Sequence, residues 1–274
     1  MCNSASKCNW EFNRREKNRF HVSEIESVWL DMKRSACVCL LLLFISSFVF
    51  AHETDSLFVP PKPEKPLRYC SSVKKWIAFA TADSNMVEIT HLKGVRMDLR
   101  YATFENVTGH DLYCGVQRAF VHKDAAAKLR KAVKIMEKEM PGSELVILDA
   151  SRPLYAQEAL RKTVRGTLYS AYVSSPATGG LHNFGLALDL GITGADGNLL
   201  DMGTDFDSFE RCAGEVGEAD ALKSGRLTQQ QVDNRNKLRK IMKGAGWVPL
   251  GSEWWHFNAY PSKYVRENYP KFPF

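Results

Sequence analysis

The amino-acid sequence predicts a single α+β domain in which helices pack on a central, mainly antiparallel sheet. Short apolar runs, some of them alternating with polar residues, indicate strands, and longer segments with apolar residues every three or four positions indicate helices. Turn residues join several strands directly, as in hairpins, instead of through a helix each time. The domain of about 200 residues that these elements form has the usual size of a single domain.

The first half of the domain contains three predicted strands and a helix. Residues 86–90 and 95–101 alternate apolar and polar side chains on either side of Gly94, as half-buried strands do. A helix is predicted over 124–140, because its apolar residues form one stripe at helical spacing. The apolar run 144–149 predicts a strand at the centre of the sheet.

The second half adds two helices and two strands. A proline at its start favours a helix over 155–167, since proline is tolerated in a first helical turn. A Ser- and Gly-rich loop, 170–181, leads into the apolar run 186–192, which predicts a strand. A threonine and a glutamine at capping-box spacing begin a helix over 228–245. The aromatic run 252–258 predicts the last strand.

Residues 32–51 have the composition of a secretory signal peptide. Two basic residues precede an apolar run that ends in small residues, which predicts cleavage after Ala51. The run is too short for a comfortable transmembrane span, so no stable membrane insertion is expected after cleavage. Residues 1–31 are polar and unpatterned, and we interpret them as a non-native extension upstream of the true start, Met32. The alternative is a cytoplasmic tail on a signal anchor.

Removal of residues 1–51 leaves a mildly basic chain. The formal net charge falls from +6 to +4 and no basic stripe remains, so nucleic acid is not a predicted partner. Residues 52–67 contain four prolines and predict an extended linker, which leaves 68–274 as the folded domain. Three cysteines remain, which outside the cytoplasm predicts one disulfide and one free thiol without fixing the pair. They are Cys70, Cys114 and Cys212.

Two distant motifs supply the ligands of an open zinc site. Residues 180–189 contain His182 and Asp189, and the second motif, Glu253-Trp254-Trp255-His256, contributes another imidazole. Three protein ligands leave a fourth position for water, as in catalytic zinc sites. Asp189 lies in an apolar run, where a carboxylate is costly unless it is paired or bound to a metal. The sequence therefore predicts one Zn²⁺ per chain, although each residue alone could be structural.

Glu253 and Arg152 are the predicted catalytic residues. Because Glu253 precedes His256 by three positions, the strand must bulge or twist to bring both side chains to one metal. Zinc lowers the pKa of a bound water, and Glu253 is the predicted base that moves its proton to the leaving amine. Arg152 follows the predicted strand 144–149 and can stabilise the oxyanion, unless it forms an ordinary Arg–Asp pair.

Several motifs resemble the D-alanyl-D-alanine dipeptidases, zinc peptidases related to the D-alanyl-D-alanine carboxypeptidases. The motifs are 98–103, 122–125, 149–153, 182–189, 201–207, 253–256 and 269–274. The resemblance spans roughly residues 86–274 and implies the D-Ala-D-Ala metallopeptidase (hedgehog-like) fold. It also implies that His182, Asp189 and His256 hold zinc, that Glu253 is the base, and that Arg152 stabilises the transition state.

The same resemblance implies that Asp207 pairs with the free amino terminus of a dipeptide. A carboxylate that recognises an ammonium group excludes longer peptides, whose amide carries no charge at that position. The family usually has serines where this chain has Gly180 and Leu181. Leu181 cannot donate a side-chain hydrogen bond to a substrate carboxylate, so the departure concerns substrate preference and not the metal.

The sequence thus predicts a periplasmic or secreted zinc dipeptidase that hydrolyses D-Ala-D-Ala or similar D-dipeptides. A peptidoglycan D,D-carboxypeptidase or L,D-type endopeptidase on the same fold is the alternative, with peptidoglycan fragments as its partners. A third alternative is a non-catalytic wall-binding module. The presence of all three metal ligands together with Glu253 argues against that module.

Overall fold

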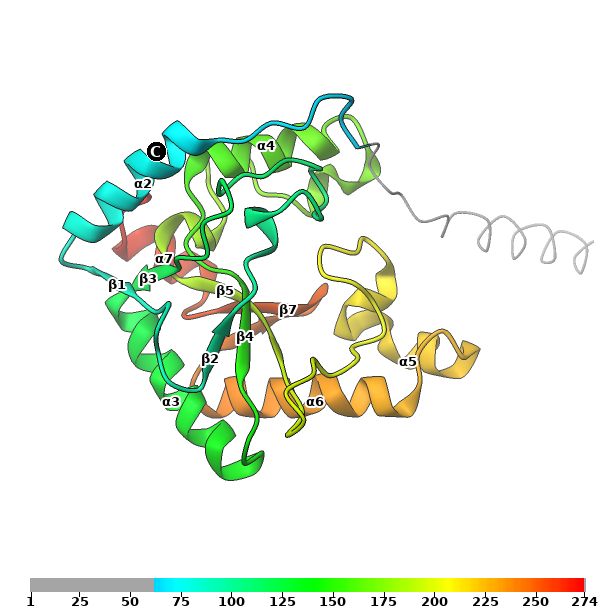
Figure 1. The fold of residues 1–274 in the computed structure, drawn as a ribbon. Coiled ribbons are helices and arrows are strands. Elements are labelled where there is room, and N and C mark those ends of the chain that lie inside the picture. The colour runs from blue at the N-terminus through cyan, green and yellow to red at the C-terminus, as the bar shows by residue number, and fades with distance from the viewer. Residues whose placement is uncertain (1–61, 274) are drawn as a thin grey trace, which may run out of the picture. The chain divides into compact units, whose positions relative to one another are not determined.

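The computed structural model describes residues 62–273, all of which belong to one compact unit (Figure 1). The predicted extension, the signal peptide and most of the linker lie outside the described residues. The last linker residues lie against the domain, where Lys62 Nζ is 3.1 Å from a carboxylate oxygen of Glu105. None of the helices within 62–273 is long and apolar enough to cross a membrane.

Five strands form the central sheet, and the prediction of a single α+β domain is confirmed. The sheet is mixed, because its first pair of strands is parallel and the other three pairs are antiparallel. Every residue of the two middle strands is buried, which explains why their sequences are continuous apolar runs. The spatial order is β2 (Val95–Met97), β4 (Leu145–Asp149), β5 (Ala187–Ile192), β7 (Glu253–Asn258) and β6 (Val248–Leu250).

The helices follow the predicted apolar stripes. In the view of Figure 1, α3 (Lys123–Glu139) and α6 (Gln229–Gly244) lie below the central strands, and they contact each other. α4 (Leu154–Val164) lies above them. The predicted capping box of α6 is present, because Thr228 Oγ1 accepts a hydrogen bond from Gln231 N and Gln231 Oε1 accepts one from Thr228 N.

Both strands predicted in the first part of the domain are present, but each is shorter than predicted. β1 (Met86–Glu88) pairs with β3 (Phe120–His122) in a separate two-stranded sheet, so it lies outside the central sheet. The second strand ends at Met97, and the chain then enters the 3₁₀ helix η1 (Arg100–Ala102). Alternation identifies a strand but not its partner, and both strands here pair with residues distant in sequence.

Several elements were not predicted from the sequence. Most bury only a few residues or are too short to show a period. They are α2 (Cys70–Ala82), α5 (Glu215–Ser224), α7 (Ser262–Asn268), β3, β6, and the 3₁₀ helices η2 (Leu168–Ala171), η3 (Leu181–Phe184) and η4 (Arg211–Ala213).

Cys70 and Cys114 form a disulfide, which decides the pairing that the sequence left open. The bond ties the first residue of α2 to the loop that precedes β3. Cys212 is free and buried. The loop closed by the disulfide spans a sequence separation of 44, so the cross-link restricts the unfolded chain considerably.

Replacing both Cys70 and Cys114 with serine is expected to lower the free energy of unfolding by about 2–4 kcal/mol. Urea unfolding with and without a thiol reductant measures the change. The reductant should destabilise the wild type and Cys212→Ala, which keeps the cross-link, but leave the double variant unaffected. Equal stability of the wild type and the double variant would contradict a stabilising role for the disulfide.

Candidate metal centre and active site

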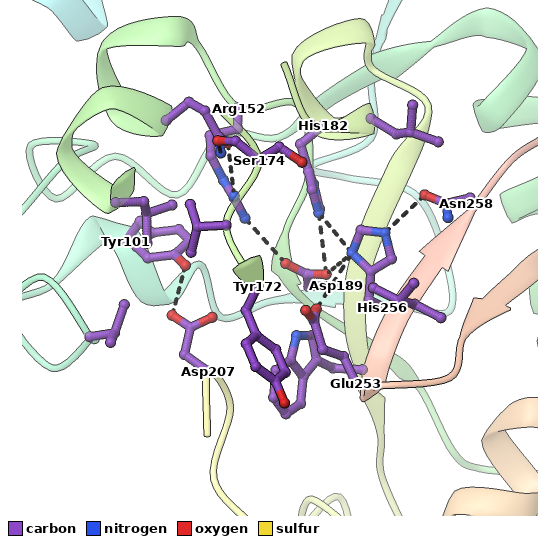
Figure 2. A pocket seen from close by; sticks show the side chains of 18 of the residues that line it. Tyr101, Arg152, Tyr172, Ser174, His182, Asp189, Asp207, Glu253, His256 and Asn258 are labelled. Atoms are coloured by element: carbon purple, nitrogen blue, oxygen red, sulfur yellow. Dashed lines mark hydrogen bonds and ion pairs between the residues drawn. The ribbon is translucent and has the colours of Figure 1, made fainter. Parts of the chain in front are cut away.

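Three side chains from different elements converge at one end of the central strands (Figure 2). His182 lies in η3, Asp189 in β5 and His256 in β7. β5 and β7 are neighbours, and Asp189 is the register partner of His256, so these two side chains meet across the sheet. The sheet therefore fixes two of the three groups, and the short helix brings the third.

The turn between η3 and β5 depends on a glycine. Gly185 ends η3 with a φ of +68°, a backbone conformation that side chains disfavour. A Cβ atom at this position would lie 2.9 Å from the backbone nitrogen of His122. Any larger residue would displace the turn that places His182 beside β5.

The potential ligand atoms lie close enough to share one cation. Asp189 Oδ1 is 3.3 Å from His182 Nε2 and 2.9 Å from His256 Nδ1, and these two nitrogens are 3.1 Å apart. In the described part of the chain, this is the group of histidine and acidic residues that could hold a metal ion. The structure thus brings together all three residues that the sequence motifs singled out.

Hydrogen bonds on the outer side of each imidazole favour metal binding on the inner side. His182 Nδ1 lies 2.7 Å from the carbonyl oxygen of Ala150, and His256 Nε2 lies 2.8 Å from Asn258 Oδ1. Each acceptor takes a ring N–H, which leaves the lone pair of the other nitrogen directed toward Asp189. Two imidazole nitrogens and one carboxylate oxygen form a donor set that suits zinc and leaves a coordination position open.

β7 is irregular where the second motif begins. On β6, the adjacent residues Pro249 and Leu250 pair with Phe257 and Glu253 of β7. The three β7 residues between Glu253 and Phe257 therefore have no partner on β6. This irregularity lets Glu253 and His256 face the same centre, with Glu253 Oε2 3.9 Å from His256 Nδ1. It is the departure from a flat strand that their spacing required.

Arg152 both forms an ion pair and reaches the metal site. Its Nε and Nη2 lie 2.8 and 2.7 Å from Asp149 Oδ2, and Nη2 is also 3.4 Å from Asp189 Oδ2. Tyr113 donates a hydrogen bond to the other oxygen of Asp149 at 2.7 Å. The Arg–Asp pair that was the alternative interpretation is therefore present, and it holds a guanidinium group that lines the cavity.

A cavity of about 220 Å³ opens beside the three potential metal ligands, and all of the predicted site residues line it. Asp207 borders it on the side of Tyr101, whose hydroxyl donates a 2.7 Å hydrogen bond to Asp207 Oδ2, and Asn258 lies on the far side of the cluster (Figure 2). The volume is below the roughly 300–1,000 Å³ of pockets for drug-sized ligands, so the cavity suits a small molecule.

Burial and the neighbouring charges shift the pKa values of three groups at the site. Burial raises the pKa of Asp189, but the two imidazoles outweigh this effect and hold it below its usual value. Burial lowers the pKa of His256, but its hydrogen bond to Asp189 raises it to about 9. Burial raises the pKa of Glu253, which moves this carboxyl toward the range of a general base.

Some site residues were not predicted. Asn258 could have been found, because it lies two positions after His256 and therefore on the same face of β7. Tyr101 lies in η1 and within motif 98–103, but the motif alone assigned it no role. Tyr113 precedes the disulfide-bonded Cys114, and no local pattern in the sequence marks it.

Comparison with known proteins agrees with this geometry. A family of peptidases termed M15, described as D-Ala-D-Ala dipeptidase, matches residues 84–274. The D-alanyl-D-alanine dipeptidase of Escherichia coli (strain K12) is 36% identical over 163 residues, which cover 60% of this chain and 78% of that protein. The dipeptidase of the same name from Enterococcus faecium is 29% identical over 202 residues, covering 65% and 93% of the two chains. That of Enterococcus faecalis is 30% identical over 200 residues, covering 65% and 90%.

Proposed function

The chain belongs to the D-Ala-D-Ala dipeptidase family of M15 metallopeptidases, and on this premise we propose that it is a zinc dipeptidase that hydrolyses D-alanyl-D-alanine or similar D-dipeptides. The observation that carries the proposal is the group of His182, Asp189 and His256 beside Glu253 in one small cavity. We also propose that the domain has the hedgehog-like fold of this family, which the mixed sheet and its packed helices support.

His182, Asp189 and His256 would hold the zinc ion. When bound there, zinc supplies a Lewis acid for the scissile carbonyl and lowers the pKa of a water molecule. Glu253 would accept a proton from the attacking water and pass it to the leaving amine, a task that its raised pKa favours. Arg152, fixed by Asp149, donates a hydrogen bond to the oxyanion that develops on the substrate.

Asp207 is the proposed partner of the substrate's amino terminus. It lies in the same cavity as Glu253 but is held by Tyr101 instead of the metal ligands. A small cavity with a carboxyl group at one side favours a zwitterionic dipeptide over a peptidoglycan strand, which supports the dipeptidase over the endopeptidase alternative.

A panel of substrates tests this function. The metal-loaded protein is expected to release free D-alanine from D-Ala-D-Ala and to be inactive on the N-acetylated dipeptide, which lacks the ammonium group. L-Ala-L-Ala and a muropeptide complete the panel. Cleavage of the muropeptide or the N-acetylated dipeptide at the rate of D-Ala-D-Ala would instead support the carboxypeptidase or endopeptidase alternative.

The pH dependence of catalysis tests Asp207. Burial raises the pKa of Asp207 to about 8, so its carboxyl becomes charged only as the pH approaches 8. The substrate ammonium loses its proton above about 8. We therefore expect kcat/KM to rise toward pH 8 and then fall. Asp207→Asn should lower the maximum by about 10–100-fold and remove the rising limb that Asp207 causes.

The nearby exposed Asp205 provides the matched control, and Asp205→Asn should leave the profile unchanged.

The pH dependence of stability gives a second measurement of the Asp207 carboxyl. Because the folded state keeps the Asp207 proton up to about pH 8, the stability that this group contributes is present below the ordinary pKa of about 4 and is lost as the pH rises toward 8. Asp207→Asn should therefore raise the melting temperature at pH 8. An unchanged pH profile in this variant would remove Asp207 from substrate binding.

We propose a periplasmic or secreted location for the protein. The composition of residues 32–51 motivates this proposal, and the Cys70–Cys114 disulfide supports it, because such bonds persist in oxidising compartments. Protease accessibility of the protein in intact and permeabilised cells distinguishes the two locations from the cytoplasm.

A further inference from the structure

One cation at the cavity lacks an acidic partner among residues 62–273. Arg266 of α7 lines the same cavity as the metal-binding group. Its guanidinium donates hydrogen bonds to the carbonyl oxygens of Thr178 and Gly179 and to Ser262 Oγ, and no carboxylate of the described residues lies within ion-pair distance. Arg266 is exposed at the edge of the cavity, so its charge is solvated but has no counter-ion among these residues, and the three acceptors leave two of its five N–H donors free.

The other arginine at the cavity already has a role in the proposed reaction. Arg152 pairs with Asp149 and with Asp189 and is assigned to the developing oxyanion, so it is not available to bind a second anionic group. The cavity also holds the carboxyl groups of Asp207 and Glu253. Arg266 is thus the group at this cavity, within the described residues, that is best suited to compensate an additional negative charge.

A second hydrogen-bonding group, the hydroxyl of Ser174, lies beside the segment that Arg266 holds. Ser174 lines the cavity, and its hydroxyl makes no hydrogen bond within residues 62–273, while its carbonyl accepts one from Gln157. A Cβ atom at Gly180 would lie 3.8 Å from Ser174 Oγ. It would also lie 3.7 Å from Gln157 Oε1, so both contacts are ordinary van der Waals contacts. The φ of Gly180 is −84°, so the backbone does not require glycine here. Figure 2 shows Ser174 on the Arg152 and His182 side of the cavity, away from Asp207.

We propose that Arg266 and Ser174 bind the C-terminal carboxylate of the dipeptide, at the side of the cavity that Gly180 lines. This inference rests on the proposed function. A guanidinium group and a hydroxyl can both donate hydrogen bonds to one carboxylate, and such charge-assisted bonds are strong. With Asp207 taking the ammonium group, the cavity then matches both charges of a zwitterionic dipeptide and selects for a free carboxyl terminus as well as a free amino terminus.

Binding to the metal-loaded Glu253→Ala variant, which should not turn over substrate, tests the proposal. Calorimetry would compare D-Ala-D-Ala with its C-terminal amide, which has the same shape but no negative charge. We expect the acid to bind about tenfold or more tightly than the amide. Adding Arg266→Gln should reduce this ratio to near one, and adding Ser174→Ala should reduce it partly.

Lys271→Gln is the matched control for a purely structural effect. Lys271 Nζ donates to the carbonyl oxygens of Pro176 and Ala177 in the same loop, but the residue does not line the cavity. This variant should keep the full preference for the acid. Equal binding of acid and amide in the starting variant, an equal loss of both in Arg266→Gln, or the same change in Lys271→Gln would overturn the subsite. A preference for the acid that depends on Arg266, found in a protein whose wild type does not hydrolyse D-Ala-D-Ala, would overturn the proposed function alone.

Discussion

Replacing Glu253 with alanine is expected to lower kcat for D-Ala-D-Ala by about 10²–10⁴-fold, the usual contribution of a general base. Glu253 lies 3.9 Å from the ring of His256, and its buried carboxyl has a raised pKa, so it is placed and tuned to accept a proton beside the ligands. It is not one of the three groups whose atoms converge. The variant should therefore still bind one zinc ion per chain, measured by elemental analysis.

Glu253→Gln serves as the closest control because it keeps the shape and removes only the base. Both variants should show the same loss of kcat and the same metal content as the wild type. Glu267, which pairs with Lys263 on the exposed side of α7, gives a remote control whose alanine variant should be fully active. Turnover by Glu253→Gln within a few-fold of the wild type would remove Glu253 from proton transfer.

Replacing His182 or His256 with alanine is expected to abolish both metal binding and hydrolysis. Each variant removes one of three ligand atoms and leaves Asp189, whose side chain is 2% exposed, without one of its two imidazole partners. We expect zinc affinity to fall by more than about 100-fold, beyond the 10–100-fold typical of a lost outer partner. Competition with a chromogenic chelator measures the affinity.

Two further variants test whether the loss of zinc binding is specific to the ligand group. Asn258→Ala removes the acceptor behind His256 and should weaken zinc binding by about 10–100-fold while retaining some activity. His91→Ala, at an exposed histidine that does not belong to the ligand group, should bind zinc as the wild type does. Full zinc occupancy in His182→Ala would show that the metal is held elsewhere.

The sequence was sufficient for the parts of the site that depend on local pattern. The apolar run around Asp189 marked a buried strand, and the three-residue spacing of Glu253 and His256 required an irregular strand, which β7 has. Buried carboxylates and imidazoles in such places are unusual enough to indicate chemistry, and so these residues could be identified before their meeting in space was known.

Contacts between distant segments could not be predicted in this way. Alternation marked residues 86–88 as a strand but could not specify β3 as its partner. Three cysteines allowed three pairings, and only the fold places Cys70 beside Cys114. Likewise Arg266 lies on a seven-residue helix with no distinctive motif, and its place at the cavity follows from the packing of α7 against η3.

The most direct test of the account is the position of the bound metal. Anomalous diffraction at the zinc edge, from crystals of the zinc-loaded protein, is predicted to give one peak per chain within about 2.0–2.2 Å of His182 Nε2, a carboxylate oxygen of Asp189 and His256 Nδ1. A peak at any other place, or none at these three residues in a protein that hydrolyses D-Ala-D-Ala, would contradict it.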